Sequence, residues 1–189
     1  ILNLSIARKE YKQLSEVLGK ITTTYQVKDL LTNILKDDAT KLEVLNRIEK
    51  IEPFIAEQTP KGSIKDQLLD EDAEDLARLL IEGVEMKRDT LTKFLNKDWY
   101  DLRPLHNFFF TRDMYNEVLI GRMANAVRDR EAIIMQSIFD FTPGFNTKTL
   151  NLATTPDPLR KLTIEGGDVQ IARDDILVIG NGTRTSTRA

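Results

Sequence analysis

The sequence predicts an α/β fold in which a helical block is followed by a region of mixed helices and strands. Through most of residues 1–100, apolar side chains recur at steps of three and four, which is the spacing of one helix face. The shorter remainder contains six of the nine glycines and several short apolar runs that are typical of strands. The change in composition near residue 100 therefore separates the two parts.

The first helix is expected over residues 2–18, where Leu4, Tyr11 and Leu18 share one face with other apolar residues. Gly19 is expected to end this helix. The alternating pattern of residues 21–27 then predicts a short strand.

Residues 28–98 are expected to be helical. Apolar blocks predict helices near residues 30–35, 42–51, 76–84 and 91–95, and Pro53 ends the second of them. Residues 59–63, with the sequence TPKGS, predict a loop.

In the second part, apolar runs at 108–110, 118–120 and 176–179 predict strands, and residues 123–139 predict a helix. Residues 142–158 are rich in Pro, Thr and Asn and predict an extended loop. Residues 169–172 and 176–179, joined by a short polar turn, predict a hairpin.

Composition excludes several classes of partner. The 189 residues include 27 basic and 30 acidic side chains, so the net charge is −3 and no nucleic-acid partner is expected. With 41% apolar residues the chain can bury a core. No apolar stretch approaches the ~20 residues of a membrane span, so no membrane association and no signal peptide are expected.

The chain contains no cysteine and a single histidine, His106. These residues therefore cannot form a disulfide, a zinc–thiolate site, a cysteine nucleophile or a histidine metal cluster. The absence of cysteine fits a reducing compartment. Because the chain begins at Ile1 and stops at Ala189, just after a strand pattern, we interpret it as a segment of a longer protein, with a processed mature chain as the alternative.

Polar motifs follow apolar elements at four places in the second part. They are residues 104–113, 128–131, 164–168 and 180–186. Taken singly, each has an ordinary structural explanation. Asp113 could form a turn or a helix cap, Arg128 could form a solvated ion pair with Glu131, residues 165–168 could be a tight turn, and Arg184 could be a loop side chain.

Taken together, these motifs favour one kind of ligand. The acids Asp113 and Glu165 can bind a guanidinium through paired, charge-assisted hydrogen bonds, and Arg128 and Arg184 can bind a carboxylate in the same way. A ligand that carries both groups is the amino acid arginine.

In order and spacing, the motifs resemble those of the arginine deiminases over residues 102–187. The resemblance is carried by Phe110-Thr111-Arg112-Asp113, Arg128 before Arg130-Glu131, Ile164–Asp168 and Arg184-Thr185. It implies a partial five-bladed α/β propeller (pentein) with an all-helical insertion. Residues 1–27 would be part of the first propeller module, 28–100 the helical insertion, and 101–189 further modules that are incomplete at the C-terminus.

The resemblance also assigns roles. Asp113 and Glu165 match acids that hold the substrate guanidinium, and Arg128 and Arg184 match arginines that hold its α-carboxylate. Asn107 matches an asparagine that contacts the amino-acid end, and Asp168 has a supporting role. His106 is not the family's catalytic histidine and is expected to be a structural or rim residue.

The reaction implied is hydrolysis of L-arginine to L-citrulline and ammonia through a covalent Cys-amidino intermediate, with no metal or organic cofactor. The family's catalytic Cys and His do not lie in this chain, so we expect the chain alone to be inactive. The resemblance further implies a cytoplasmic protein that forms homo-oligomers, or a chain that associates with the missing remainder of its parent.

Two alternatives remain at this level. The parent could be another guanidine-modifying hydrolase, such as an arginine dihydrolase that releases two ammonia molecules. The chain could also be a non-catalytic module that binds arginine or a protein partner through its helical surface.

Overall fold

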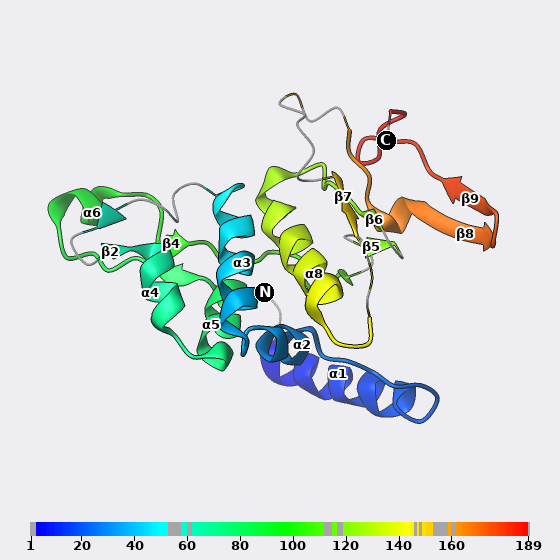
Figure 1. The fold of residues 1–189 in the computed structure, drawn as a ribbon, viewed down its shortest axis with the longest axis horizontal. Helices are drawn as coiled ribbons and strands as arrows, with labels where there is room; N and C mark the ends of the chain where they lie inside the picture. The colour runs from blue at the N-terminus through cyan, green and yellow to red at the C-terminus, as the bar shows by residue number, and fades with distance from the viewer. Residues whose placement is uncertain are drawn as a thin grey trace.

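The computed structural model describes residues 3–52, 58–59, 62–111, 115–116, 119–145, 147, 149–152, 159 and 162–188. Its helices, in chain order, are α1 (Leu4–Leu18), α2 (Val27–Ile34), α3 (Asp38–Glu49), α4 (Ile64–Asp70), α5 (Ala73–Glu82), α6 (Leu91–Leu95), η2 (Ala126–Arg128), α8 (Asp129–Phe141) and η4 (Gly166–Asp168). Its strands are β1 (Gln58–Thr59), β2 (Gly62–Ser63), β3 (Val84–Glu85), β4 (Tyr100–Leu102), β5 (Tyr115–Asn116), β6 (Leu119–Ile120), β7 (Leu150–Asn151), β8 (Val169–Arg173) and β9 (Ile176–Ile179). This mixture of helices and small sheets is consistent with the predicted α/β class (Figure 1).

One hydrophobic core joins the helices of the first part to α8. Leu31, Leu45 and Leu76 from the first part and Ile134 from α8 are all fully buried in it. In Figure 1, α3 lies beside α8, and the two helices contact each other. The change in composition near residue 100 therefore does not separate two cores, and the three-part division of the chain stays a prediction.

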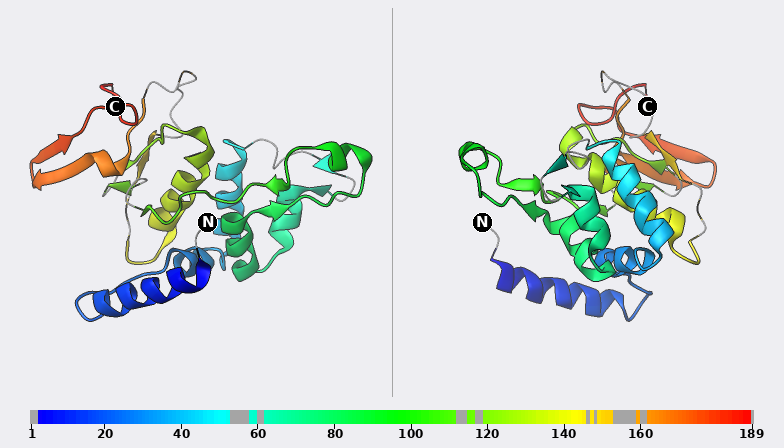
Figure 2. Two further views of the ribbon diagram at one scale, coloured as in Figure 1. Left: turned by 180° about the vertical axis from the view of Figure 1, so that it is seen from behind. Right: turned by 60° about the vertical axis from the view of Figure 1, so that its left-hand side comes forward.

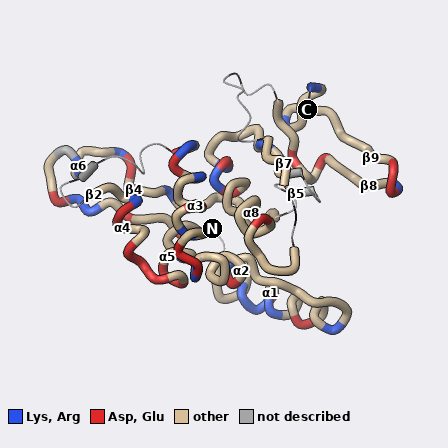
Figure 3. The backbone as a smooth tube through the Cα atoms, viewed as in Figure 1, with Lys and Arg blue, Asp and Glu red and all other residues tan. Residues whose placement is uncertain are grey.

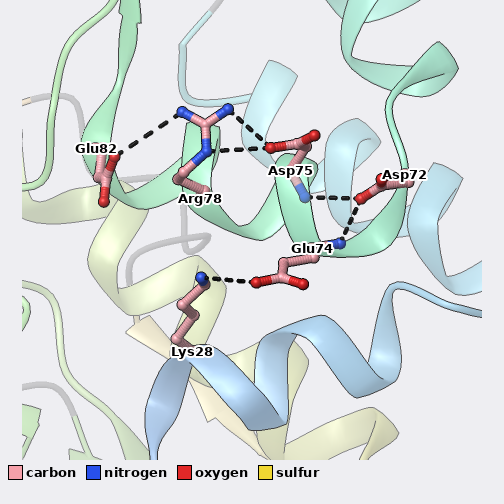
Figure 4. A network of polar contacts seen from close by, with 6 residues as sticks. All are labelled: Lys28, Asp72, Glu74, Asp75, Arg78 and Glu82. Carbon is pink, nitrogen blue, oxygen red and sulfur yellow. Dashed lines mark hydrogen bonds and ion pairs between the residues drawn. The ribbon is translucent and has the colours of Figure 1, made fainter.

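Capping side chains mark the start of the helices of the first part, except for α2. Asp72 accepts hydrogen bonds from the backbone N–H groups of Glu74 and Asp75, at 2.9 and 2.8 Å, and so starts α5 (Figure 4). An exposed ion pair between Lys28 and Glu74, at 3.3 Å, links α2 to α5 in the same view. Such exposed pairs contribute little to stability, so the buried leucines hold these helices together.

Helix α1 confirms the first predicted helix, and Gly19 is its C-cap. None of its residues is buried, and it projects along one edge of the molecule (Figures 1 and 2). The strand predicted over residues 21–27 was wrong. The backbone N–H groups of Ile21 and Thr22 both donate hydrogen bonds to the Leu18 carbonyl, at 2.9 Å, so this segment is a turn. Helix α2 then begins at Val27.

The first part is mainly helical but not entirely so. Thr59, Gly62 and Ser63 of the loop predicted at residues 59–63 instead lie in the antiparallel pair β1–β2, and β3 pairs with β4. Gly83, just before β3, has a φ of +87°, and a Cβ there would lie 2.6 Å from the Leu102 carbonyl oxygen. Glycine allows this close approach of two backbones.

The second part contains a parallel crossover and a hairpin. Strand β6 pairs with β7 in parallel, and α8 lies between them in sequence, so β7 interrupts the loop predicted at 142–158. Strands β8 and β9 form the predicted hairpin. The helix predicted over 123–139 begins later, with η2 followed by α8.

The strand predicted at residues 108–110 was also wrong. These residues form a turn in which the Phe110 N–H donates to the Asn107 carbonyl at 3.0 Å. Phe108 is buried, whereas Phe109 and Phe110 are exposed, so the apolar run does not mark a buried strand. Among the helices that the structure describes, none has the length and apolar character needed to cross a membrane.

Candidate functional site

The structure places the predicted site residues in two clusters. The first contains Glu165, Asp168 and Arg184, and the second contains Asn107 and Arg128. Asp113 lies outside the described residues.

The backbone around Glu165 lies between two other segments of chain. The Ile164 N–H donates to the Arg122 carbonyl at 3.0 Å, and the Ser186 N–H donates to the Thr163 carbonyl at 2.8 Å. A Cβ at Gly121 would lie 2.2 Å from the Ile164 carbonyl oxygen, so glycine is needed for this approach. The segment ending at Glu165 is thus hydrogen-bonded on both sides, although it is not a regular strand.

The Glu165 carboxylate is buried, with 4% of the residue exposed. Its Oε1 accepts a hydrogen bond from the Ala124 N–H at 3.4 Å, and its Oε2 lies 3.4 Å from Nη1 of Arg184. Within the described part of the chain, this Oε2 accepts no hydrogen bond. A buried carboxylate needs a cationic or hydrogen-bonding partner, so this oxygen is suited to bind a guanidinium.

Asp168 acts on Glu165 through a third residue. The buried hydroxyl of Thr185 donates to Asp168 Oδ2 at 2.6 Å and accepts from the Glu165 N–H at 3.1 Å. The Asp168 carbonyl also accepts from the Gly180 N–H at 2.8 Å, just after β9. Asp168 and Thr185 together hold the backbone of Glu165 in place.

The second cluster forms at the start of α8. Arg128 Nε donates to Glu131 Oε2 at 2.7 Å, and Glu131 Oε1 accepts from the Asn107 N–H at 2.9 Å. Arg128 Nη2 also donates to the Asn107 carbonyl at 3.4 Å. The side chain of Glu131 is fully buried and that of Arg128 is 8% exposed, so the interpretation of this pair as solvated was wrong.

A short stretch of backbone connects the two clusters. Ala124, whose N–H binds Glu165, is followed by η2, which ends at Arg128. The Asn125 side chain caps η2 by accepting from the Val127 N–H at 3.2 Å. Ala124, which binds Glu165, and Glu131, which positions Arg128, therefore lie in one continuous segment, residues 124–131.

The whole chain, residues 1–189, matches the family model described as arginine deiminase. The chain belongs to the arginine deiminase family. It is 29% identical over 199 residues to the arginine deiminase of Limosilactobacillus reuteri, 30% over 204 residues to that of Pediococcus pentosaceus, and 26% over 199 residues to that of Borrelia recurrentis. Each of these alignments covers 98% of this chain and 48% of the relative, so the chain spans about half the length of these curated relatives.

Two residues of the candidate arginine deiminase site were missed from the sequence. Thr185 joins Asp168 to Glu165, and Glu131 joins Arg128 to Asn107. Both stand in the quoted motifs, Thr185 directly after Arg184 and Glu131 three residues after Arg128. That spacing was a usable signal for Glu131, because residues three apart are neighbours on a helix.

Arg130 lies in the motif of residues 128–131, but its side chain contacts the first part of the chain instead of the candidate site. It is 2% exposed, its Nη1 donates to Glu52 Oε2 at 2.9 Å, and its Nη2 donates to the Arg103 carbonyl. Burial raises the pKa of Glu52 above its usual value and lowers the pKa of Arg130. This pair links α8 to the segment that follows α3, outside the two clusters.

His106 is exposed and lines a groove with Trp99 and Tyr100, and its expected role as a structural or rim residue stays a prediction. Among the residues that the structure describes, no group of three or more His, Cys, Asp or Glu side chains could hold a metal ion.

Proposed function

We propose that this chain supplies the substrate-binding residues of an enzyme that hydrolyses L-arginine to L-citrulline and ammonia. The arginine deiminase family of the chain and the names of its relatives support this proposal. The chain contains no cysteine, so a nucleophilic thiolate must come from residues beyond the 189 given.

The observation that carries the proposal is the buried Glu165 carboxylate, whose Oε2 accepts no hydrogen bond from the described residues. Arg184 already places a guanidinium nitrogen 3.4 Å from this oxygen, so the position accepts the functional group of the substrate. The Arg184 side chain is 63% exposed and can move away. Together with Asp113, Glu165 would hold the plane of the substrate guanidinium.

The amino-acid end of the substrate would bind at Arg128, Arg184 and Asn107. Arg128 is held by Glu131 and by the Asn107 carbonyl, which leaves it little freedom to change position. Once Arg184 leaves Glu165, its guanidinium is free to pair with the substrate carboxylate. This exchange would couple occupation of the guanidinium end to recognition of the carboxylate end.

The chemistry explains the need for two fixed acids. The guanidinium of arginine stays protonated because its pKa is above ~12, and its delocalised carbon is a poor electrophile. The thiolate adds to this carbon, the C–N bond to one terminal nitrogen breaks, and that nitrogen leaves as ammonia with a proton transferred from the acids or the solvent. Water, activated by a histidine, then adds to the Cys-amidino carbon, which releases citrulline and the thiol.

Several further properties belong to the same proposal. The resemblance implies a five-bladed propeller, a homo-oligomer or an association with the remainder of the parent chain, and a cytoplasmic location. L-Arginine is the proposed small-molecule partner, and neither nucleic acid nor a membrane is needed.

The experiment is the substitution Glu165→Gln in the full-length protein, with kcat/KM for citrulline formation as the measurement. The substitution removes a charge-assisted hydrogen bond to the substrate, worth ~1.5–3 kcal/mol. We therefore expect kcat/KM to fall about 10- to 150-fold. Glu74→Gln is the matched control, because Glu74 lies in an exposed ion pair with Lys28.

An unchanged kcat/KM in a folded Glu165→Gln protein would reject the proposed role. The ammonia released per arginine tests the reaction itself. One ammonia with citrulline supports a deiminase, and two ammonia molecules support the dihydrolase alternative.

A further inference from the structure

Two ion pairs join the first part of the chain to α8, one near each end of that helix. Arg130 Nη1 lies 2.9 Å from Glu52 Oε2 at the start of α8, and Arg47 Nη1 lies 2.7 Å from Asp140 Oδ2 near its end. Residues 130 and 140 are separated by about 15 Å along the helix, at 1.5 Å per residue. The Arg130–Glu52 pair is the one next to the candidate site, because Arg130 directly precedes Glu131.

Arg130 holds two different segments with its two terminal nitrogens. Its Nη1 donates to Glu52 Oε2, and its Nη2 donates to the Arg103 carbonyl. The residue is buried, and side chains of both charges stand at the start of α8 (Figure 3). Because a guanidinium is planar and its N–H groups point in fixed directions, it holds both segments in one position relative to the helix.

Both of these segments are anchored in the first part of the chain. The Glu52 N–H donates to the Ile48 carbonyl at 2.9 Å, which ties Glu52 to the last turn of α3. The Leu105 N–H donates to the Ile81 carbonyl at 2.9 Å, which ties the segment after β4 to α5. The start of α8 is therefore connected through Arg130 to two helices of the first part.

The segment after β4 is held by α8 at two points. Arg130 binds the carbonyl of Arg103, and Glu131 Oε1 accepts from the Asn107 N–H at 2.9 Å. Glu131 Oε2 also accepts from Arg128 Nε at 2.7 Å, and Glu131 interacts electrostatically with Arg130. A change at Arg130 can therefore move both Arg128 and Asn107.

We infer that Arg130 is a positioning residue that fixes Arg128 and Asn107 against the first part of the chain and so sets the recognition of the substrate carboxylate. The inference rests on the proposed function, in which Arg128 and Asn107 bind the amino-acid end of L-arginine. Arg130 acts only through its neighbours, because its own terminal nitrogens are bound to Glu52 and the Arg103 carbonyl.

The two ends of the substrate should respond differently to the loss of Arg130. The proposed guanidinium site at Glu165 is contacted by Ala124, Arg184 and Thr185. None of these is a residue to which Arg130 donates. Loss of Arg130 should therefore weaken recognition of the carboxylate and spare recognition of the guanidinium. Agmatine, which carries the guanidinium of arginine but no carboxylate, measures the guanidinium end alone.

The test is the substitution Arg130→Met in the full-length protein, because methionine fills an apolar site but cannot donate these hydrogen bonds. We expect KM for L-arginine to rise at least about tenfold while kcat stays within about threefold. The inhibition constant of agmatine should stay within about twofold of wild type. Arg130→Lys should give a smaller rise in KM, because an ammonium can pair with Glu52 but lacks the two fixed donor directions.

Arg47→Met is the matched control. Arg47 also joins the first part to α8 through an ion pair that is mostly buried, and its guanidinium lies 4.9 Å from the centroid of the Phe141 ring. Its loss should lower the free energy of unfolding but leave KM for arginine within about twofold, because its contacts lie at the far end of α8. Urea unfolding of both variants separates a general loss of stability from a loss of position.

A second variant, Glu52→Gln, changes the other side of the pair and is expected to raise KM in the same direction. An unchanged KM in folded Arg130→Met and Glu52→Gln proteins would overturn the inference. Equal rises in KM for Arg130→Met and Arg47→Met, or a rise in the agmatine inhibition constant as large as that in KM, would also overturn it. A wild-type protein that forms no citrulline would instead reject the proposed function, and the inference with it.

Discussion

The hydroxyl of Thr185 donates a hydrogen bond to Asp168 Oδ2 over 2.6 Å, and it also accepts the Glu165 N–H. This one hydroxyl joins two motifs that lie 17 residues apart in sequence. Under the proposed function, Asp168 would therefore act on Glu165 through Thr185.

Thr185→Val is expected to weaken the site. The substitution keeps the shape of the side chain but leaves the Glu165 N–H and a carboxylate oxygen without a partner, at a cost of about 1–3 kcal/mol in the free energy of unfolding. We also expect kcat/KM for arginine to fall about tenfold in the full-length protein. Thr185→Ser, which restores the hydroxyl, should recover most of both losses. Equal unfolding free energies and equal kcat/KM values for the Thr185→Val and Thr185→Ser variants would contradict this role of Thr185.

Glu131→Ala is expected to be strongly destabilising. It removes the buried partner of Arg128 and leaves an uncompensated charge, which typically costs about 3–5 kcal/mol. Urea unfolding measures this loss. Asp175→Ala is the control, because the Arg173–Asp175 pair is more than 60% exposed and its removal should change stability very little. A loss no larger than that of the control would show that burial of the Arg128 pair is unimportant.

The half-buried Glu52 predicts a pH dependence of stability. Burial raises the pKa of Glu52 in the folded protein, so the folded state binds the proton more tightly than the unfolded state. The stabilisation from this group is complete below the unfolded pKa, about 4.3, and is lost as the pH rises through the folded pKa. Relative to wild type, Glu52→Gln should therefore become more stable as the pH increases from about 4 to 7. A difference in unfolding free energy that is constant over this range would contradict the prediction.

The 189-residue chain alone is expected to produce no citrulline above background, because it contains no cysteine nucleophile. Its binding of L-arginine should also be weak, with a Kd above about 1 mM, or less than ~4 kcal/mol of binding free energy. Isothermal titration calorimetry measures this value. Tight binding by the isolated chain would instead favour the non-catalytic arginine-binding module.

Helices with a clear apolar face were predictable from the sequence. The first helix and the β8–β9 hairpin are confirmed, because repeated apolar spacing and a short polar turn are local signals. The strands predicted at 21–27 and 108–110 failed for a different reason. A strand needs a partner for its backbone hydrogen bonds, and in both places those bonds are made within local turns.

The candidate site also shows the difference between what local sequence patterns predict and what depends on tertiary contacts. Its charged residues were identified by type and order, and the resemblance gave them roles. Sequence could not show that Arg184 pairs with Glu165, that Arg128 is buried with Glu131, or that Thr185 connects Asp168 to Glu165. The contacts of Arg184 and Thr185 join segments that are distant in sequence, and the burial of the neighbouring Arg128 and Glu131 depends on what packs over them in the folded chain.

By itself, the sequence determined the mixed α/β class, the family and the chemical types of the candidate site residues. The tertiary structure decided which of these groups are buried, which are paired and which residues hold them. Burial and pairing depend on how elements pack, because the energy of a charge is set by its surroundings.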